Sequence, residues 1–107
     1  PVLIGTNEDM DVINIIKRMC PNALNLAGKT SIFQIASLGR SAKFCIGNDT
    51  GPMHFLAASS RKKTKNIILF GNASDPKLCA PVGKNVVILQ KDDINEITPD
   101  EIKNLIN

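Results

Sequence analysis

The sequence has little aromatic and imidazole chemistry: no tryptophan, no tyrosine, four phenylalanines and one histidine, His54. Proteins that bind nucleic acid usually spread basic residues along a face and stack bases on aromatic side chains. Here four of the 13 basic residues are concentrated in one segment, 61–65, and the rest of the chain is close to neutral. We therefore expect no nucleic-acid partner.

Metal-ligating residues are also scarce. The three cysteines, Cys20, Cys45 and Cys79, are far apart, none forms a Cys-x-x-Cys pair, and only one histidine could join them. This pattern argues against a zinc site and against a disulfide scaffold. Cys45 stands inside an apolar run and is expected to be a buried, small hydrophobic residue. We expect no metal, no cofactor and a reducing, cytoplasmic setting.

Long hydrophobic runs and catalytic motifs are missing too. No segment approaches the ~18 apolar residues that cross a bilayer, and the first ten residues do not resemble a signal peptide. No Walker loop, Gly-x-Gly-x-x-Gly motif or Ser-His-Asp spacing occurs. Pro1 leads directly into an apolar run, so we expect either a trimmed start or a piece of something larger.

Short apolar runs alternate with amphipathic stretches along the whole chain. This alternation predicts an α/β fold: a Rossmann-like parallel sheet with helices on both faces. We expect one domain over residues 1–107, without repeats or linkers. Strands are expected at 2–4, 23–27, 43–47, 66–70 and 86–89, and helices at 8–20, 31–39, 52–60 and 98–106.

Hydrophobic spacing and capping residues give more detailed expectations for three helices. In the first helix, the buried stripe is expected to be Val12, Ile15, Ile16 and Met19. In the second, Ile32, Ile35 and Ala36 are expected to be buried, with Gly39 as the stop. Thr98 and Glu101 have capping-box spacing around Pro99, a residue suited to the first helical position. Residues 71–81 are expected to form a loop.

The segment 44–54 carries the most chemical information. An apolar strand ends, a polar turn with Gly51 follows, and a helix opens at Pro52. In parallel sheets ligands bind beyond the carboxyl ends of the strands, and a helix amino terminus there favours phosphate. His54 falls in the first helical turn, and Asp49 at the strand exit could orient a ligand hydroxyl. The simpler alternative is that Asp49 or Thr50 only caps the helix and His54 is an ordinary histidine.

Several segments together resemble one family. Gly-Asn-Asp-Thr-Gly-Pro-Met-His-Phe-Leu-Ala-Ala, starting at Gly47, is similar to the characteristic turn and helix of glycosyltransferase family 9, the heptosyltransferases of lipopolysaccharide core synthesis. Asn-Ile-Ile-Leu-Phe-Gly-Asn-Ala-Ser-Asp-Pro, starting at Asn66, is similar to the family's next strand and loop. Weaker similarity lies at 26–31 and 79–81, so the resemblance extends from about Val2 to Pro81.

The resemblance implies a GT-B enzyme whose C-terminal Rossmann-like domain binds a nucleotide-sugar donor, typically ADP-heptose. In this sequence the implied donor-binding residues are Asp49, Thr50, Gly51, Pro52 and His54, joined with less support by Gly28, Lys29 and Thr30. No catalytic residue is implied. The catalytic base and the lipid-acceptor site would belong to an N-terminal domain that the sequence does not contain, so no turnover is expected from this chain alone.

Other functions remain open at this point. The chain could be a non-catalytic remnant or an interaction module that keeps the fold, or an unrelated flavodoxin-like or nucleotide-binding regulator. The basic loop at 61–65 could be simply solvated, or it could contact anionic lipid or a phosphorylated acceptor. A cytoplasmic protein, peripheral at the inner face of the inner membrane, fits the resemblance. A face normally covered by the partner domain would favour a homodimer.

Overall fold

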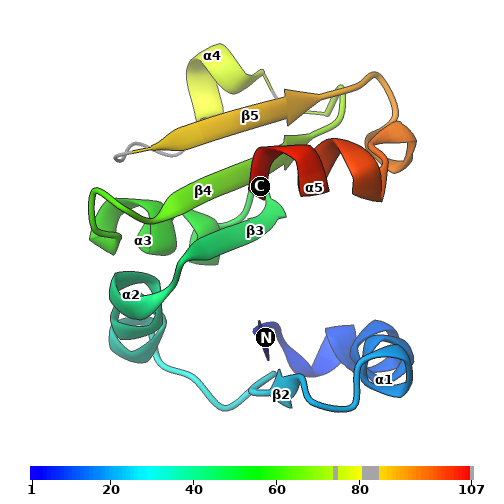
Figure 1. Cartoon of the computed structure of the whole chain (residues 1–107), viewed down its shortest axis with the longest axis vertical. Helices are drawn as coiled ribbons and strands as arrows, with labels where there is room; N and C mark the ends of the chain where they lie inside the picture. The colour runs from blue at the N-terminus through cyan, green and yellow to red at the C-terminus, as the bar shows by residue number, and fades with distance from the viewer. Residues whose placement is uncertain (74, 81–84, 107) are drawn as a thin grey trace. The chain divides into compact units, whose positions relative to one another are not determined.

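The computed structural model describes residues 1–73, 75–80 and 85–106. Two compact units make up the chain, Pro1–Ser31 and Ile32–Asn107 (Figure 1). The predicted loop at 71–81 includes Ser74 and Pro81, and the resemblance at 79–81 includes Pro81. Both residues lie outside the described part of the chain.

The first unit is built on a two-stranded parallel pairing. Val2 pairs with Leu24 and Leu3 with Asn25. A capping box made by Thr6 and Asp9 opens the helical segment, with the Thr6 amide donating to Asp9 Oδ2 at 2.7 Å. The elements are β1 (Val2–Leu3), the 3-10 helix η1 (Asn7–Asp9), α1 (Met10–Met19) and β2 (Leu24–Asn25).

The predicted buried stripe of α1 is wrong. Ile13 is the buried residue of the helix, whereas Val12, Ile15, Ile16 and Met19 are 37–83% exposed. The side that is at least partly buried consists of Met10, Ile13 and Lys17, a spacing of three and four residues. Lys17 belongs to it because its ammonium donates to the carbonyls of Pro21 (2.9 Å) and Ala23 (2.5 Å) just beyond the helix end.

The second unit contains a three-stranded parallel sheet in the order β3-β4-β5. Cys45 is opposite Asn66, and Asn66 is in turn opposite Val86, so the three strands run in register. The elements are α2 (Ile32–Ser41), β3 (Phe44–Asn48), α3 (Gly51–Ser59), β4 (Lys65–Phe70), α4 (Pro76–Cys79), β5 (Val86–Gln90), the 3-10 helix η2 (Ile94–Glu96) and α5 (Pro99–Ile106). The predicted parallel, helix-flanked α/β class is confirmed.

The central strand β4 forms the core of this unit. Ile67, Ile68 and Phe70 are at most 1% exposed. A strand between two neighbours and covered on its faces is expected to read as a continuous apolar run, as Ile-Ile-Leu-Phe does here. The strand's position in the middle of the sheet follows from this pattern.

Helices α2 and α3 pack closely through Gly39. A Cβ built at Gly39 would lie 2.9 Å from Ser59 Oγ and 3.1 Å from the Leu56 carbonyl oxygen. The prediction that Gly39 stops α2 is therefore wrong: the helix continues to Ser41, and the glycine allows two helix backbones to approach. Ile32, predicted to be buried, is 54% exposed, whereas Ile35 is buried as predicted.

The connection after β4 contains a short helix that the sequence did not predict. Asp75 caps α4, its Oδ1 accepting from the Lys77 amide at 2.9 Å, and Pro76 follows at the helix start. One turn of helix therefore interrupts the predicted loop.

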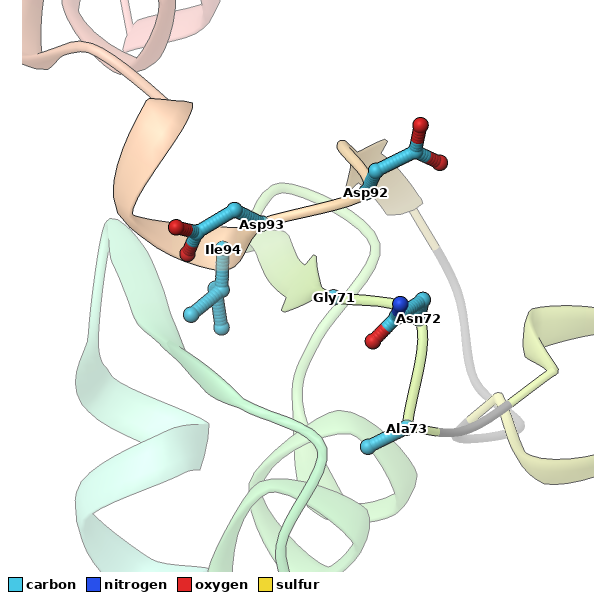
Figure 2. A pocket seen from close by; sticks show the side chains of 6 residues that line it. All are labelled: Gly71, Asn72, Ala73, Asp92, Asp93 and Ile94. Atoms are coloured by element: carbon cyan, nitrogen blue, oxygen red, sulfur yellow. The ribbon is translucent and has the colours of Figure 1, made fainter.

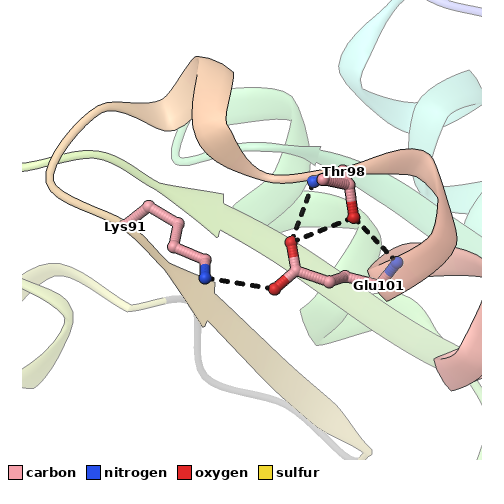
Figure 3. Close-up of polar contacts among 3 residues, drawn as sticks. All are labelled: Lys91, Thr98 and Glu101. Atoms are coloured by element: carbon pink, nitrogen blue, oxygen red, sulfur yellow. Dashed lines mark hydrogen bonds and ion pairs between the residues drawn. The ribbon is translucent and has the colours of Figure 1, made fainter.

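The predicted capping box of α5 is confirmed (Figure 3). The Thr98 amide donates to Glu101 Oε2 at 2.8 Å, and the Glu101 amide donates to Thr98 Oγ1 at 3.3 Å. Glu101 also pairs with Lys91 Nζ at 3.2 Å, which joins α5 to the segment just after β5. These contacts lower the pKa of Glu101, first through the Thr98 backbone hydrogen bond and then through Lys91.

Acid is expected to weaken this end of the fold. Because the pKa of Glu101 is lowered on folding, its contribution is present above its unfolded pKa and is lost as the pH falls through the folded value. Glu101→Gln keeps a capping amide but removes the charge, so its unfolding free energy should fall less steeply in acid than that of wild type. Glu96→Gln, which removes the same charge from η2, is the control and should keep the wild-type slope. Urea titrations between pH 3 and 6 measure this, and identical acid slopes for Glu101→Gln and wild type would contradict it.

Candidate functional site

A tight connection between β3 and α3 brings a helix amino terminus to the carboxyl edge of the sheet. β3 ends at Asn48 and α3 begins at Gly51, so only Asp49 and Thr50 lie between them. Thr50 is the N-cap residue with extended backbone angles, φ −137° and ψ 163°. The predicted strand, turn and helix are confirmed in this order.

Gly47 and Met53 fix the first turn of the helix on the strand. A Cβ at Gly47 would lie 2.9 Å from both Cγ and Sδ of Met53, whose residue is 3% exposed. The glycine therefore leaves the space in which the Met53 side chain packs. Neither residue was predicted to have this role, although a glycine at the end of a buried strand is a recognised sign of close approach.

The amino end of α3 presents unused hydrogen-bond donors. The Thr50 side chain makes no capping hydrogen bond, and the first intrahelical bond runs from the His54 amide to the Thr50 carbonyl at 3.2 Å. Pro52 has no N–H, which leaves the amides of Gly51 and Met53 without an intrahelical acceptor. A Cβ added at Gly51 would meet nothing within 4 Å, so the space in front of this turn is open. Thr50 thus occupies the cap position without acting as a side-chain cap.

Asp49 holds the imidazole of His54 beside this turn. His54 Nε2 lies 3.2 Å from Asp49 Oδ1. The carboxylate side chain is 15% exposed and the imidazole 47%, so the acid is the more buried partner and the ring remains accessible. A carboxylate that contacts one ring nitrogen fixes the orientation of an imidazole and leaves its other ring nitrogen for a second partner.

A hollow of about 440 Å³ lies at the same edge of the sheet, beyond β4 and β5. Figure 2 shows the side chains that line it, from the segments just after the two strands: Gly71, Asn72, Ala73, Asp92, Asp93 and Ile94. Amide and carboxylate oxygens can accept hydrogen bonds from hydroxyl groups. The sequence alone did not predict this hollow, although two adjacent parallel strands that both end in polar residues point to it.

The other predicted site residues lie in the first unit. Gly28 has a positive φ of 69°, and a Cβ there would lie 2.6 Å from Asn7 Oδ1, so only glycine suits this turn. Lys29 is exposed and its amide donates to the Leu26 carbonyl at 3.0 Å. Thr30, just before the second unit, is partly buried. The structure therefore brings together the Asp49–His54 group, and it places Gly28, Lys29 and Thr30 in a separate compact unit.

The described residues offer no metal-binding cluster, no activated cysteine nucleophile and no membrane-spanning helix. Ranges 1–73, 75–80 and 85–106 hold no group of three His, Cys, Asp or Glu side chains that could bind a metal. Cys45 is buried as predicted, and burial raises the pKa of its thiol, which disfavours the nucleophilic thiolate. In the same ranges no helix has the length and apolar character to cross a membrane.

The parallel sheet, its flanking helices and the helix amino terminus at its carboxyl edge define a Rossmann-like α/β protein. The chain belongs to glycosyltransferase family 9 (heptosyltransferase), whose sequence profile matches residues 2–104. It is 30% identical over 96 residues to lipooligosaccharide heptosyltransferase 2 of Haemophilus ducreyi, an alignment that covers 82% of this chain and 26% of that protein.

Two solved structures have the same fold. The ADP-heptose lipopolysaccharide heptosyltransferase II of Escherichia coli superimposes with a TM-score of 0.80 at 26% identity, covering 98% of this chain and 35% of that one. A family 9 glycosyl transferase from Veillonella parvula superimposes with a TM-score of 0.72 at 20% identity, covering 97% and 29%. These relatives are GT-B glycosyltransferases. The chain spans about a quarter to a third of their lengths.

Proposed function

We propose that this chain is a nucleotide-sugar-binding domain of a heptosyltransferase and holds the diphosphate of an ADP-heptose-like donor at the β3–α3 turn. The observation that carries this proposal is the open amino end of α3, with its two unused amides beside an oriented His54. Helix amino termini bind phosphate because their amides and dipole both face the anion. Family membership makes a nucleotide sugar the natural ligand.

Each site residue has a distinct part in this proposal. The amides of Gly51 and Met53 and the Thr50 hydroxyl donate to phosphate oxygens, and Pro52 sets the helix start. His54 faces the same charge, and Asp49 orients it and lies near the donor sugar. The hollow lined by Asn72 and Asp92 accepts the hydroxyl-bearing part of the donor. Gly28, Lys29 and Thr30 are the proposed contacts to the nucleotide part of the donor.

This arrangement supports the leaving-group half of an inverting sugar transfer. A hydroxyl oxygen of a lipid acceptor attacks the anomeric carbon, the bond from that carbon to the phosphate oxygen breaks, and ADP departs with the electron pair. The helix amides and His54 stabilise the charge that develops on the departing diphosphate. The acceptor proton goes to a carboxylate base, which we place outside these 107 residues. This chain alone should therefore bind donor without turnover.

The setting of this activity follows from its substrates. A sugar nucleotide is a cytoplasmic metabolite, and a lipid acceptor belongs to a membrane, so we place the enzyme in the cytoplasm at the inner face of the inner membrane. Lipopolysaccharide core synthesis is the process to which such a transfer contributes. A second copy of the chain is a further partner to test, by light scattering.

Calorimetry with ADP and ADP-heptose tests the donor site. His54→Ala should weaken both ligands about tenfold, the loss expected for one hydrogen bond to a charged group on an accessible side chain. Asp49→Ala should weaken ADP-heptose more than ADP, because the acid lies near the sugar as well as the imidazole. His54→Gln, which keeps a donor group, should recover part of the affinity.

The control is Lys103→Gln, which removes an exposed cation from the last turn of α5, away from the proposed donor site, and should bind like wild type. If neither ligand gives heat with the folded wild-type chain, the chain is a non-catalytic remnant or an interaction module. If both ligands bind and Asp49→Ala and His54→Ala are indistinguishable from wild type, the site is elsewhere.

A further inference from the structure

In the second unit, basic and acidic side chains gather at opposite ends of the parallel strands. Five exposed basic residues, Arg40, Lys43, Arg61, Lys62 and Lys63, lie in the last turn of α2 and in the loops that lead into β3 and β4. Because the strands are parallel, these segments share the amino edge of the sheet, opposite the turn at Asp49. We call these five residues the basic edge.

Acidic residues are absent from the segments that form the basic edge. The sequence has no Asp or Glu from Ile32 to Asn48 or from Thr50 to Ser74. Among the described residues, the ion pairs are His54–Asp49 and Lys91–Glu101, and neither includes a member of the basic edge. The acids of this unit follow the carboxyl ends of the strands, at Asp49, Asp75, Asp92, Asp93 and Glu96, and the start of α5.

The negative carboxyl ends of neighbouring helices neutralise only a part of the positive charge at the basic edge. α2 and α3 end at the basic edge, and α5 ends there too, since Lys65 Nζ donates to the Leu105 carbonyl. Three helix carboxyl termini carry roughly 1.5 negative charges together. The five exposed cations and Lys65 together carry more positive charge than the three helix ends can neutralise, by roughly four to five charges. The basic edge therefore keeps a net positive field.

The local backbone shows that the loop is ordered while its side chains are free for a partner. The Thr64 amide donates to the Arg61 carbonyl at 2.9 Å, and the Thr64 hydroxyl donates to the Ala42 carbonyl at 2.8 Å. Asn85 Nδ2 donates to the Lys62 carbonyl. These bonds use backbone atoms of Arg61 and Lys62, which leaves the guanidinium and ammonium groups on the surface.

We propose that the basic edge docks this unit on a bilayer of anionic phospholipid. Clustered Lys and Arg side chains bind such surfaces by charge alone, without a built pocket. Phe44, 38% exposed beside Lys43, adds an aromatic group at the same edge. The acids of the unit lie at the opposite edge, so no carboxylate within the basic edge opposes its attraction to anionic lipid. Phe44 is the single aromatic residue named at this edge, whereas surfaces that bind single-stranded nucleic acid stack successive bases on several aromatic side chains. This inference rests on charge placement and is independent of donor binding.

Vesicle co-sedimentation of the full chain tests it. Wild type should bind vesicles of phosphatidylcholine with 30% phosphatidylglycerol, should not bind pure phosphatidylcholine, and should release as NaCl rises from 50 to 300 mM. The triple variant Arg61→Gln, Lys62→Gln, Lys63→Gln should bind about 100-fold more weakly, since each cation near an anionic leaflet contributes about fivefold. The charge-matched control, Arg18→Gln, Lys77→Gln, Lys91→Gln, should bind much more tightly than the triple variant.

Circular dichroism spectra confirm that all three proteins are folded before they are compared. Equal binding by the triple variant and wild type overturns the proposal, as does equal loss in both triple variants. Displacement of wild type from anionic vesicles by a single-stranded oligonucleotide at lower concentration than phosphatidylglycerol would identify the partner as nucleic acid, and would also overturn it.

Discussion

Gly51→Asp is expected to lower the affinity for ADP about 30-fold while leaving the fold at least as stable as wild type. The position is the first of α3, and an added side chain meets nothing within 4 Å. A carboxylate there interacts favourably with the helix dipole, by about 0.3–1 kcal/mol. The same carboxylate faces the diphosphate, and repulsion of roughly 2 kcal/mol between like charges at this partly solvated distance gives the 30-fold loss.

Gly51→Asp is diagnostic because it should lower the affinity for ADP without lowering the free energy of unfolding. Gly51→Asn has nearly the same size without the charge, so it separates steric from electrostatic effects and should lose only a few-fold in affinity. Calorimetry with ADP and urea unfolding of the same preparations supply the two measurements. If Gly51→Asp binds ADP like wild type, the helix amino end is not the phosphate site.

Ile68→Ala is expected to have the largest effect on stability. Ile68 is fully buried in the central strand β4, and truncating such a side chain costs about 2–5 kcal/mol through lost burial and the cavity left behind. Small domains are typically stable by about 5–15 kcal/mol, so this is a large share of the total. The melting temperature should fall by roughly 10 °C or more.

Ile88→Ala is the matched control for this prediction. Ile88 is opposite Ile68 on the neighbouring strand β5 and is 39% exposed. The same atoms are deleted from the same sheet, but less apolar surface was buried, so the loss of unfolding free energy should be about 1.5 kcal/mol, below that of Ile68→Ala. Similar losses at both positions in urea titrations would mean that β4 is not the centre of the core.

Element type and order could be predicted because hydrophobic periodicity and capping chemistry are local. The uninterrupted apolar run of β4, the Thr98–Glu101 capping box and the turn after β3 each depend on residues close together in the sequence. The parallel arrangement followed from the alternation of strands and helices.

The predictions that were wrong concern contacts between residues that are distant in the sequence. The apolar face chosen for α1 had helical spacing, yet the side that is at least partly buried includes Ile13 and Lys17, whose ammonium binds carbonyls beyond the helix end. Gly39 has the composition of a helix stop, but the proximity of Leu56 and Ser59 on α3 gives it a packing role. Periodicity does not reveal which face meets a neighbour, or which glycine allows a helix to approach.

The site follows the same division. The turn from Asn48 to His54 could be predicted from adjacent residues, and the proximity of Asp49 and His54 follows from their spacing across a strand end and a first helical turn. The hollow at Asn72 and Asp92 joins segments about 20 residues apart, and it exists because β4 and β5 are neighbours in the sheet. Such long-range neighbours become visible only in the folded structure.

The most direct test of the donor-binding proposal is a titration of the ¹⁵N-labelled chain with ADP, followed by amide chemical shifts. We expect the largest shifts at the amides of Thr50, Gly51, Met53 and His54, saturating with one ADP per chain. The basic edge provides an internal comparison, because Arg61, Lys62 and Lys63 would attract any anion without specificity. Shifts that are largest at these three residues and never saturate, with the β3–α3 turn unmoved, would contradict the account.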